Sequence, residues 1–180
     1  MNSSEQSEWI VRHIPHRVRA AVARLPMQNS LLQVEASINP ERRTERDEVY
    51  WRCATDSIWE GRMAATRWLI EFVGIQRDDG NGRAKECKKR ERKGTTKDVR
   101  IYDLDGGRRF EPSDPNAQLL ADVWKGCSQA SSHATNEYNH PPVTEKELSA
   151  ALTIILEHLQ DTVYNQAGKR VCDCVLKSKD

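Results

Sequence analysis

One long stretch of this chain, residues 40–73, restricts its fold more than any other part of the sequence. Its only proline is Pro40, which follows Asn39 and so suits a helix cap followed by the first helical residue. The stretch is rich in helix-forming residues, and its apolar side chains recur at three-, four- and seven-residue spacings. Because Gly74 offers the left-handed backbone that often ends a helix, the sequence predicts a single helix from Pro40 to Val73. The recurring apolar residues are Tyr50, Ala54, Ile58, Ala65, Leu69 and Phe72.

Three tryptophans on this predicted helix determine how much of its surface must be covered. Trp51, Trp59 and Trp68 spread over roughly half of its circumference, since each residue turns the helix by about 100°. One neighbouring helix cannot cover all three, so either the helix is central in a bundle or a tryptophan is left for a partner. We expect Trp51 and Trp59 to bind a partner. Gly61 costs helix stability relative to alanine, so we expect another backbone to approach it closely.

The N-terminal segment combines helix caps, a proline and a basic face. Ser3, Ser4 and Ser7 offer caps, and Pro15 then predicts either two short helices or one kinked helix. The apolar residues of this segment alternate with basic ones, which indicates a basic face beside an apolar one. The basic residues are Arg12, His13, His16, Arg17, Arg19 and Arg24.

Two more helices are predicted in the C-terminal third. Asp114 and Pro115 suit a cap and a first-turn proline, and they predict a helix that frays near Ser131. Thr144 and Glu147 stand at the spacing of a capping box and predict the start of the last helix. A regular apolar stripe follows and marks the strongest amphipathic helix in the chain. Its residues are Leu148, Leu152, Ile155, Leu159 and Val163.

The middle of the chain, residues 76–112, differs from the helical segments on both sides. Its basic run, residues 83–93, holds seven basic residues against two acidic ones, with glycines around it. We expect an exposed insertion that contributes nothing to the core. Residues 99–110 then alternate briefly and turn at glycine, which predicts either a small β-hairpin or an extended arm.

These elements together predict an all-α fold, a helical bundle with a long central helix, a basic insertion and a small hairpin. We expect an N-terminal helical segment at 1–38, a bundle core at 39–165 that contains the insertion at 76–112, and a tail at 166–180. A chain of 180 residues is long enough to bury a sizeable core.

Composition and charge narrow the class of protein further. The net charge is +1, which argues against a globally basic nucleic-acid binder. We expect a cytoplasmic protein, because the sequence shows neither a signal-peptide pattern nor an apolar run long enough to span a membrane. The five cysteines are an odd number without the spacing of a disulfide framework, so we expect free thiols.

The basic run is the candidate contact for nucleic acid. It can bind a phosphate backbone electrostatically, or it can be a solvated loop. Aromatic residues are absent from it, so the run by itself offers nothing for bases to stack on. The candidate RNA- or DNA-binding residues are Arg83, Lys85, Lys88, Lys89, Arg90, Arg92 and Lys93.

A polar joint between the last two predicted helices holds His133 and His140. Either histidine can carry a proton or bind a metal near physiological pH. Adding the cysteines Cys127, Cys172 and Cys174 supplies enough nitrogen and sulfur ligands for zinc, but their spacing is not that of a zinc knuckle. We therefore expect no metal and no cofactor. In the simpler interpretation, the joint satisfies the polar groups at a helix end.

The order of these elements resembles HEPN-type domains, which are small helical bundles of toxins, abortive-infection proteins and CRISPR-associated ribonucleases. The resemblance covers roughly residues 40–164 and rests on the long helix that ends in Arg67-Trp68-Leu69-Ile70-Glu71-Phe72-Val73-Gly74, the charged insertion, the Ser-Ser-His joint and the final amphipathic helix. Catalytic members cleave RNA without metal, usually as dimers, with an arginine a short spacer away from a histidine. For His133 that arginine would stand at Gly126, Cys127 or Ser128, so this chain departs from the family's pattern.

We therefore expect a non-catalytic helical module that binds a protein partner, as an accessory component of a nucleic-acid-associated or antiviral defence assembly. One alternative, implied by the resemblance, is a metal-independent ribonuclease that works as a homodimer. In that case His133 transfers the proton, His140 assists, and Lys125 or Arg67 stabilises the phosphate charge. The other alternative is an RNA- or DNA-binding protein that uses the basic insertion.

Overall fold

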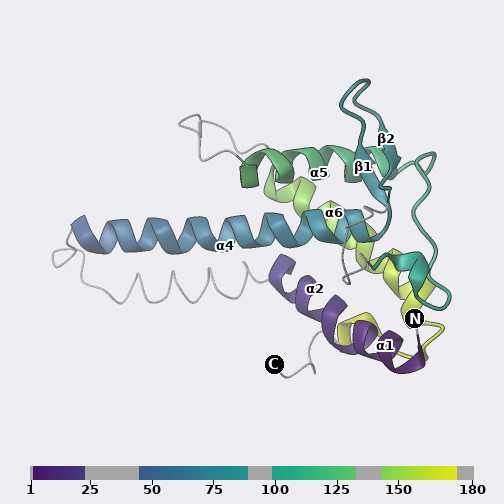
Figure 1. Ribbon diagram of the computed structural model, residues 1–180. Helices are drawn as coiled ribbons and strands as arrows, with labels where there is room; N and C mark the ends of the chain where they lie inside the picture. The colour runs from purple at the N-terminus through teal and green to yellow at the C-terminus, as the bar shows by residue number, and fades with distance from the viewer. Residues whose placement is uncertain (1, 23–44, 89–98, 133–142, 174–180) are drawn as a thin grey trace, which may run out of the picture.

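The computed structural model describes residues 2–22, 45–88, 99–132 and 143–173, and 66% of these residues are helical. A small antiparallel sheet of two strands accompanies the helices (Figure 1). Within the described residues no helix is both long and apolar enough to cross a membrane. The elements, in chain order, are α1 (Ser3–Glu8), the π-helical turn η1 (Trp9–His13), α2 (Ile14–Val22), α4 (Glu45–Phe72), β1 (Ile75–Arg77), β2 (Ala84–Glu86), the 3-10 turn η3 (Ile101–Asp103), α5 (Ala117–Ser132), α6 (Glu145–Leu159) and the π-helical turn η4 (Gln160–Tyr164).

Helix α1 begins one residue earlier than the serine caps predict. Asn2 has an extended backbone, and its side chain accepts a hydrogen bond from the Glu5 N–H at 2.8 Å. The Glu5 carboxylate accepts one from the Asn2 N–H at 2.9 Å, which completes a capping box. The prediction of a serine cap is therefore wrong, because Asn2 with a glutamate three residues later makes both bonds of the box.

Pro15 does not break the N-terminal helix, which runs without interruption from Ser3 to Val22. In a regular α-helix the proline ring clashes with the carbonyl four residues earlier. Here a π turn precedes it, in which the Ile14 N–H donates to the carbonyl of Trp9, five residues back. Of the two predicted alternatives, two separate short helices are wrong, and the segment is one helix whose local distortion is this wider turn.

The same proline leaves the carbonyl of Ile10 without a backbone donor. A side chain from the C-terminal part of the fold donates to it instead. In the π pattern the donor would be the N–H of residue 15, which proline lacks. The Tyr164 hydroxyl, in η4, donates to the Ile10 carbonyl at 2.8 Å in a buried position. A buried carbonyl without a partner is costly, so this bond joins η1 to η4.

Helix α4 ends where the sequence predicts. Gly74 has a φ of 101°, and its N–H donates to the Glu71 carbonyl at 3.1 Å. The predicted start of this helix lies outside the described residues. The expected close backbone approach at Gly61 is wrong, because a Cβ at that position would have no atom within 4 Å.

The hairpin lies earlier in the chain than predicted. Strands β1 and β2 pair with Ile75 opposite Glu86 and Arg77 opposite Ala84. Residues 99–110, where the sequence predicts a hairpin or an arm, form η3 followed by turns. Ile101, Leu104 and Phe110 are all buried there, so their apolar spacing reflects anchoring to the core rather than one face of a strand.

The insertion also contributes to the core, contrary to the prediction. Cys87 is 4% exposed, and its N–H donates to the carbonyl of Gly74 at 2.7 Å. Arg100 is 6% exposed, and its guanidinium donates to the Glu71 carbonyl at the end of α4. This cation at a helix C-terminus complements the helix dipole.

The two C-terminal helices follow the predicted pattern closely. Helix α5 begins at Ala117, two residues after Pro115, because the Asp114 carbonyl first accepts the Ala117 N–H in a turn. Thr144 and Glu147 form the predicted capping box, and all five residues of the predicted α6 stripe are buried. The chain beyond residue 165 also contributes, since Val171 is 8% exposed and its N–H donates to the Gln160 side chain.

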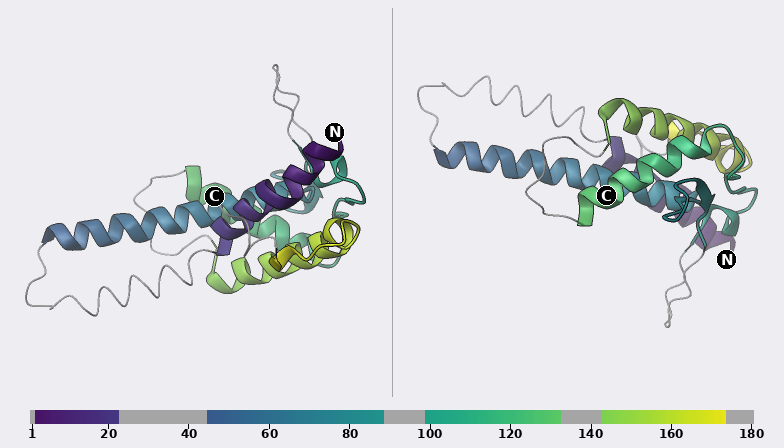
Figure 2. Two further views of the ribbon diagram at one scale, coloured as in Figure 1. Left: turned by 90° about the horizontal axis from the view of Figure 1, so that it is seen from below. Right: turned by 90° about the horizontal axis from the view of Figure 1, so that it is seen from above.

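The core surrounds only the C-terminal half of α4. Helices α2 and α5 make the most extensive contacts with α4, and α6 packs against both α4 and α5. Figures 1 and 2 show that the N-terminal half of α4 extends past the other described helices. The buried residues of α4 begin at Arg62 and Met63, which marks the boundary between the packed and projecting halves.

Candidate functional site

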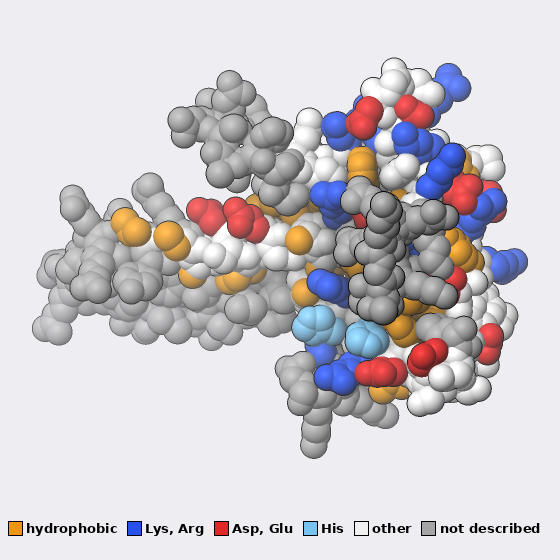
Figure 3. All heavy atoms as spheres, in the orientation of Figure 1, with side chains coloured by type: hydrophobic (Ala, Val, Ile, Leu, Met, Phe, Trp, Pro, Cys, Tyr) orange, Lys and Arg blue, Asp and Glu red, His pale blue; other side chains and the backbone are white. Residues whose placement is uncertain are grey.

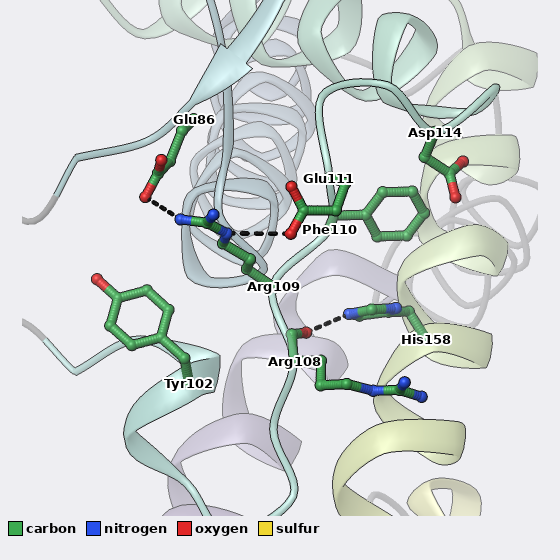
Figure 4. Close-up of a pocket in the computed structure, with 8 residues that line it drawn as sticks. All are labelled: Glu86, Tyr102, Arg108, Arg109, Phe110, Glu111, Asp114 and His158. Atoms are coloured by element: carbon green, nitrogen blue, oxygen red, sulfur yellow. Dashed lines mark hydrogen bonds and ion pairs between the residues drawn. The ribbon is translucent and has the colours of Figure 1, made fainter.

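An open pocket of about 790 Å³ lies where the end of β2, the 3-10 turn η3 and helix α6 meet (Figure 4). Five of its lining residues carry carboxylate or guanidinium groups, and three carry rings. Five of them lie within residues 108–114, and folding brings Glu86, Tyr102 and His158 beside that segment. The lining residues are Glu86, Tyr102, Arg108, Arg109, Phe110, Glu111, Asp114 and His158.

Arg109 lies at the centre of the pocket between two carboxylates. Its Nη1 is 2.5 Å from Glu86 Oε1, and its Nε is 3.2 Å from Glu111 Oε1. The hydrogen bond to Glu111, followed by the charges of Glu111 and Glu86, raises the pKa of Arg109. Because all three groups are exposed to water, these pairs orient the guanidinium more than they stabilise the fold.

His158 closes the inner side of the pocket. Its Nε2 is 2.6 Å from the Arg108 carbonyl oxygen, which can only accept, so Nε2 carries the proton. Its ring lies 4.7 Å from the ring of Phe110, centroid to centroid. Burial lowers the pKa of His158 below its usual value of 6.5, while the bond to the Arg108 carbonyl acts in the opposite direction. The imidazole is therefore neutral at physiological pH and orients the segment from Arg108 to Phe110.

The two cations proposed for the ribonuclease alternative are both in ion pairs. Lys125 Nζ is 3.0 Å from Asp79 Oδ1. Arg67 Nε is 3.0 Å from Glu71 Oε1, and its guanidinium lies 5.4 Å from the ring centroid of Trp124. His133 and His140 lie outside the described residues. The structure therefore shows what surrounds Lys125 and Arg67, whereas it does not describe the surroundings of the two histidines.

Three of the seven candidate nucleic-acid-binding residues are described. Arg83 and Lys88 are exposed, whereas Lys85 pairs with Asp78 at 3.5 Å. The backbone N–H of Gly80, more than Lys85, lowers the pKa of Asp78. The other four candidates, Lys89, Arg90, Arg92 and Lys93, lie outside the described residues. Acidic side chains thus balance part of the positive charge around the hairpin.

The structure describes the side chain of only one of the two tryptophans, Trp51 and Trp59, that are proposed to bind a partner. Trp59 is partly buried and packs against the core, and the guanidinium of Arg62 lies 5.9 Å from its ring centroid. The backbone of Trp51 belongs to α4, but its side chain lies outside the described set. Trp68 is in an aromatic stack with Trp9 and Phe72, at centroid distances of 6.1 and 5.0 Å. That stack places Trp68 in the packed half of α4.

Arg62 is a buried charge that the sequence interpretation missed. It is 3% exposed, its Nε donates to the Ala21 carbonyl at 2.8 Å, and its Nη1 is 2.5 Å from Glu145 Oε2. One side chain therefore connects α2, α4 and α6. A buried arginine with each bond satisfied in this way specifies how helices align more than it adds stability.

Cys127 shows that the nearby interior does not support thiol chemistry. Burial raises the pKa of the Cys127 thiol to about 12, although the charges of Arg67 and Arg62 oppose the shift. The thiol therefore stays protonated at neutral pH and is a poor nucleophile or metal ligand. Among the described residues, no group of three or more His, Cys, Asp or Glu is placed to hold a metal ion.

The sequence interpretation also missed the pocket. Its only local signal is the run Gly106-Gly107-Arg108-Arg109, in which paired glycines precede paired arginines. Nothing in that run indicates that Glu86, Tyr102 and His158 will lie beside it. No family model, curated protein or solved structure matches this chain.

Proposed function

We propose that the protein is a non-catalytic helical-bundle module that uses the projecting half of α4 to bind a helix of a partner protein. We further propose that it serves as an accessory component of a nucleic-acid-associated or antiviral defence assembly of HEPN-like type. The observation that carries the proposal is the division of α4, whose packed half is in the core while its other half extends outward (Figure 1). A helix that extends past its own core presents a ready surface for helix pairing.

One face of the projecting half has the spacing of a helix-binding surface. Its exposed residues are three or four positions apart, so they lie on the same side of the helix. Figure 3 shows apolar and acidic side chains along this part of the molecule. We name this face the α4 stripe. It consists of Val49, Cys53, Asp56 and Glu60 in the projecting half and of Ala64, which continues it just inside the packed half.

The charges and sizes of these side chains indicate the kind of partner. Val49 is 60% exposed, and Cys53 and Ala64 are small enough for another helix to approach closely. Asp56 and Glu60 are the charged members of the stripe, and both are acidic. We therefore infer a partner helix that carries lysine or arginine beside small apolar residues. A second copy paired antiparallel would bring the acidic residues of both chains together, which opposes self-association.

The test compares two charge reversals on exposed helix positions. The tagged protein is purified from the cells in which it occurs, and any stoichiometric partner is then produced separately for a binding titration. Glu60→Arg should weaken the measured affinity at least tenfold, as expected for like charges facing each other. Glu157→Arg makes the same charge change on α6, at another exposed position, and should leave the affinity unchanged.

Three outcomes would contradict the proposal. If both variants weaken the affinity equally, or if neither weakens it, the α4 stripe is not part of the interface. A failure to recover any stoichiometric partner would count against the interaction function itself. RNA cleavage that is lost in His133→Ala would favour the ribonuclease alternative, and incubation of the pure protein with structured and unstructured RNA tests for it.

A further inference from the structure

The pocket around Arg109 supplies what the basic run lacks by itself, an aromatic ring beside positive charge. Tyr102 is 40% exposed, and it lines the same pocket as Glu86, which is in β2, within the basic run. Figure 4 shows the Tyr102 ring on one side of the pocket and Phe110 and His158 on the other, with Arg109 between them. An exposed ring of this kind offers a face on which an unstacked base can lie.

The pocket also offers acceptors for the edge of a base. Arg109 contacts Oε1 of both Glu86 and Glu111, and within the described part of the chain neither Oε2 atom accepts a hydrogen bond. Carboxylate oxygens accept hydrogen bonds from the amino groups of cytosine, adenine and guanine. Uracil and thymine carry no such amino group. The pocket chemistry therefore favours the bases that have one.

Two exposed positive side chains stand next to pocket residues in the chain. Lys88 is exposed two residues beyond Glu86, and Arg108 is exposed next to Arg109. Arg109 pairs with both Glu86 and Glu111, and Asp114 Oδ1 accepts the Asn116 N–H at 2.8 Å. Counted with Lys88, the two arginines carry as many positive charges as the three carboxylates of the lining carry negative ones. These contacts reduce the repulsion that a phosphate would meet.

We infer that this pocket binds one unstacked nucleobase of a single-stranded nucleic acid. The base stacks on Tyr102, its amino group donates to Glu86 or Glu111, and Arg108 and Lys88 contact the adjacent phosphates. This site is separate from the α4 stripe and does not depend on the proposed partner. The same chemistry fits a free nucleotide, so the experiment must distinguish a strand from a mononucleotide.

The test measures fluorescence anisotropy with labelled 15-nucleotide homopolymers of RNA and of DNA at low salt. Tyr102→Ala should weaken binding about 5- to 150-fold, the range expected for loss of one stacked base. Tyr102→Phe keeps the ring and should bind like the wild type. Val11→Ala removes an apolar side chain that is also 40% exposed, on a different helix, and should have no effect. Polyadenine and polycytosine should bind more tightly than polyuracil.

A salt titration tests the phosphate contacts independently. The double variant Lys88→Ala/Arg108→Ala should flatten the salt dependence of the binding constant by about 0.7 for each phosphate that the protein no longer binds. Wild-type affinity in Tyr102→Ala, or an unchanged salt dependence in the double variant, would overturn the inferred site. Tight binding of adenosine or cytidine monophosphate without affinity for any strand would also overturn it, in favour of a free-nucleotide site. If neither a strand nor a mononucleotide binds, both the strand site and the free-nucleotide site are refuted. That result would say nothing about the α4 stripe.

Discussion

The two halves of α4 have the same secondary structure, yet residues 62–72 are richer in apolar side chains than residues 45–61, and the two halves meet different surroundings. From Arg62 onward the helix supplies buried residues, among them Leu69 and Phe72, that contact α2, α5 and α6. Before Arg62 its described side chains are exposed or partly buried. Apolar spacing along a helix therefore shows which face is available for packing, and the neighbouring elements decide how far along the helix packing extends.

Thiol reactivity should show the largest contrast between the two halves. Cys53 is exposed on the projecting half, whereas Cys127 is buried against the packed half with its pKa raised to about 12 from 9.0. Such a shift lowers the thiolate fraction roughly 1,000-fold at neutral pH. Alkylation followed by peptide mass spectrometry should therefore label Cys53 long before Cys127. Comparable rates at the two sites would mean that the packed half opens readily.

Truncation of apolar side chains should separate the halves by stability. Leu69 is fully buried, so Leu69→Ala should lower the free energy of unfolding by about 2–5 kcal/mol. Val49 is 60% exposed, so Val49→Ala should change it by less than about 0.5 kcal/mol. Urea denaturation of both variants measures the difference. A large loss in Val49→Ala would show that this face is covered within the isolated chain, and the α4 stripe could not then be a docking surface.

Gly61 tests the boundary between the halves. It is helical, and a Cβ there would have no atom within 4 Å, so Gly61→Ala should raise the free energy of unfolding by about 1 kcal/mol. Thermal denaturation of the variant measures this gain. Destabilisation instead would mean that something approaches Gly61 closely in solution. The variant should still bind the partner, because alanine remains small enough for helix contact.

A smaller effect is expected at the pocket end of the packed half, and it depends on pH. The folded-state pKa of His158 is lowered from 6.5, so the unfolded chain binds more protons than the folded one just below that value. The stability due to neutral His158 is therefore complete above pH 6.5 and is lost as the pH falls below it. His158→Gln should flatten this decline in denaturation curves recorded between pH 7 and pH 5. An identical decline in the variant would assign the pH dependence to other groups.

Local signals account for the parts of the fold that the sequence predicted. Gly74 ends α4 through its own backbone, and Thr144 with Glu147 begins α6 through bonds within one turn. Such features depend only on residues that are adjacent in the chain. The buried stripe of α6 is similar, because its periodicity is visible without knowledge of the neighbours.

The errors arose where distant contacts decide the structure. Residues 99–110 alternate like a strand, but Ile101 and Phe110 are drawn into the core separately. Pro15 left either two short helices or one kinked helix open, and the π turn that keeps a single helix could not be predicted from the residues nearby. The pocket depends on the meeting of Glu86 and His158, which lie far apart in the chain. The candidate histidines His133 and His140 lie outside the described residues, so their proposed roles remain predictions.

The bond between Tyr164 and Ile10 has a consequence for how the protein matures during synthesis. The Ile10 carbonyl leaves the ribosome early, and until Tyr164 is made only water can satisfy it. The N-terminal helix can therefore form early, but its Ile10 carbonyl cannot be buried away from water without cost before η4 docks. A replacement of Pro15 that restored an N–H would give the carbonyl a local donor and relax the requirement for tyrosine, so these two positions should accept changes together more readily than separately.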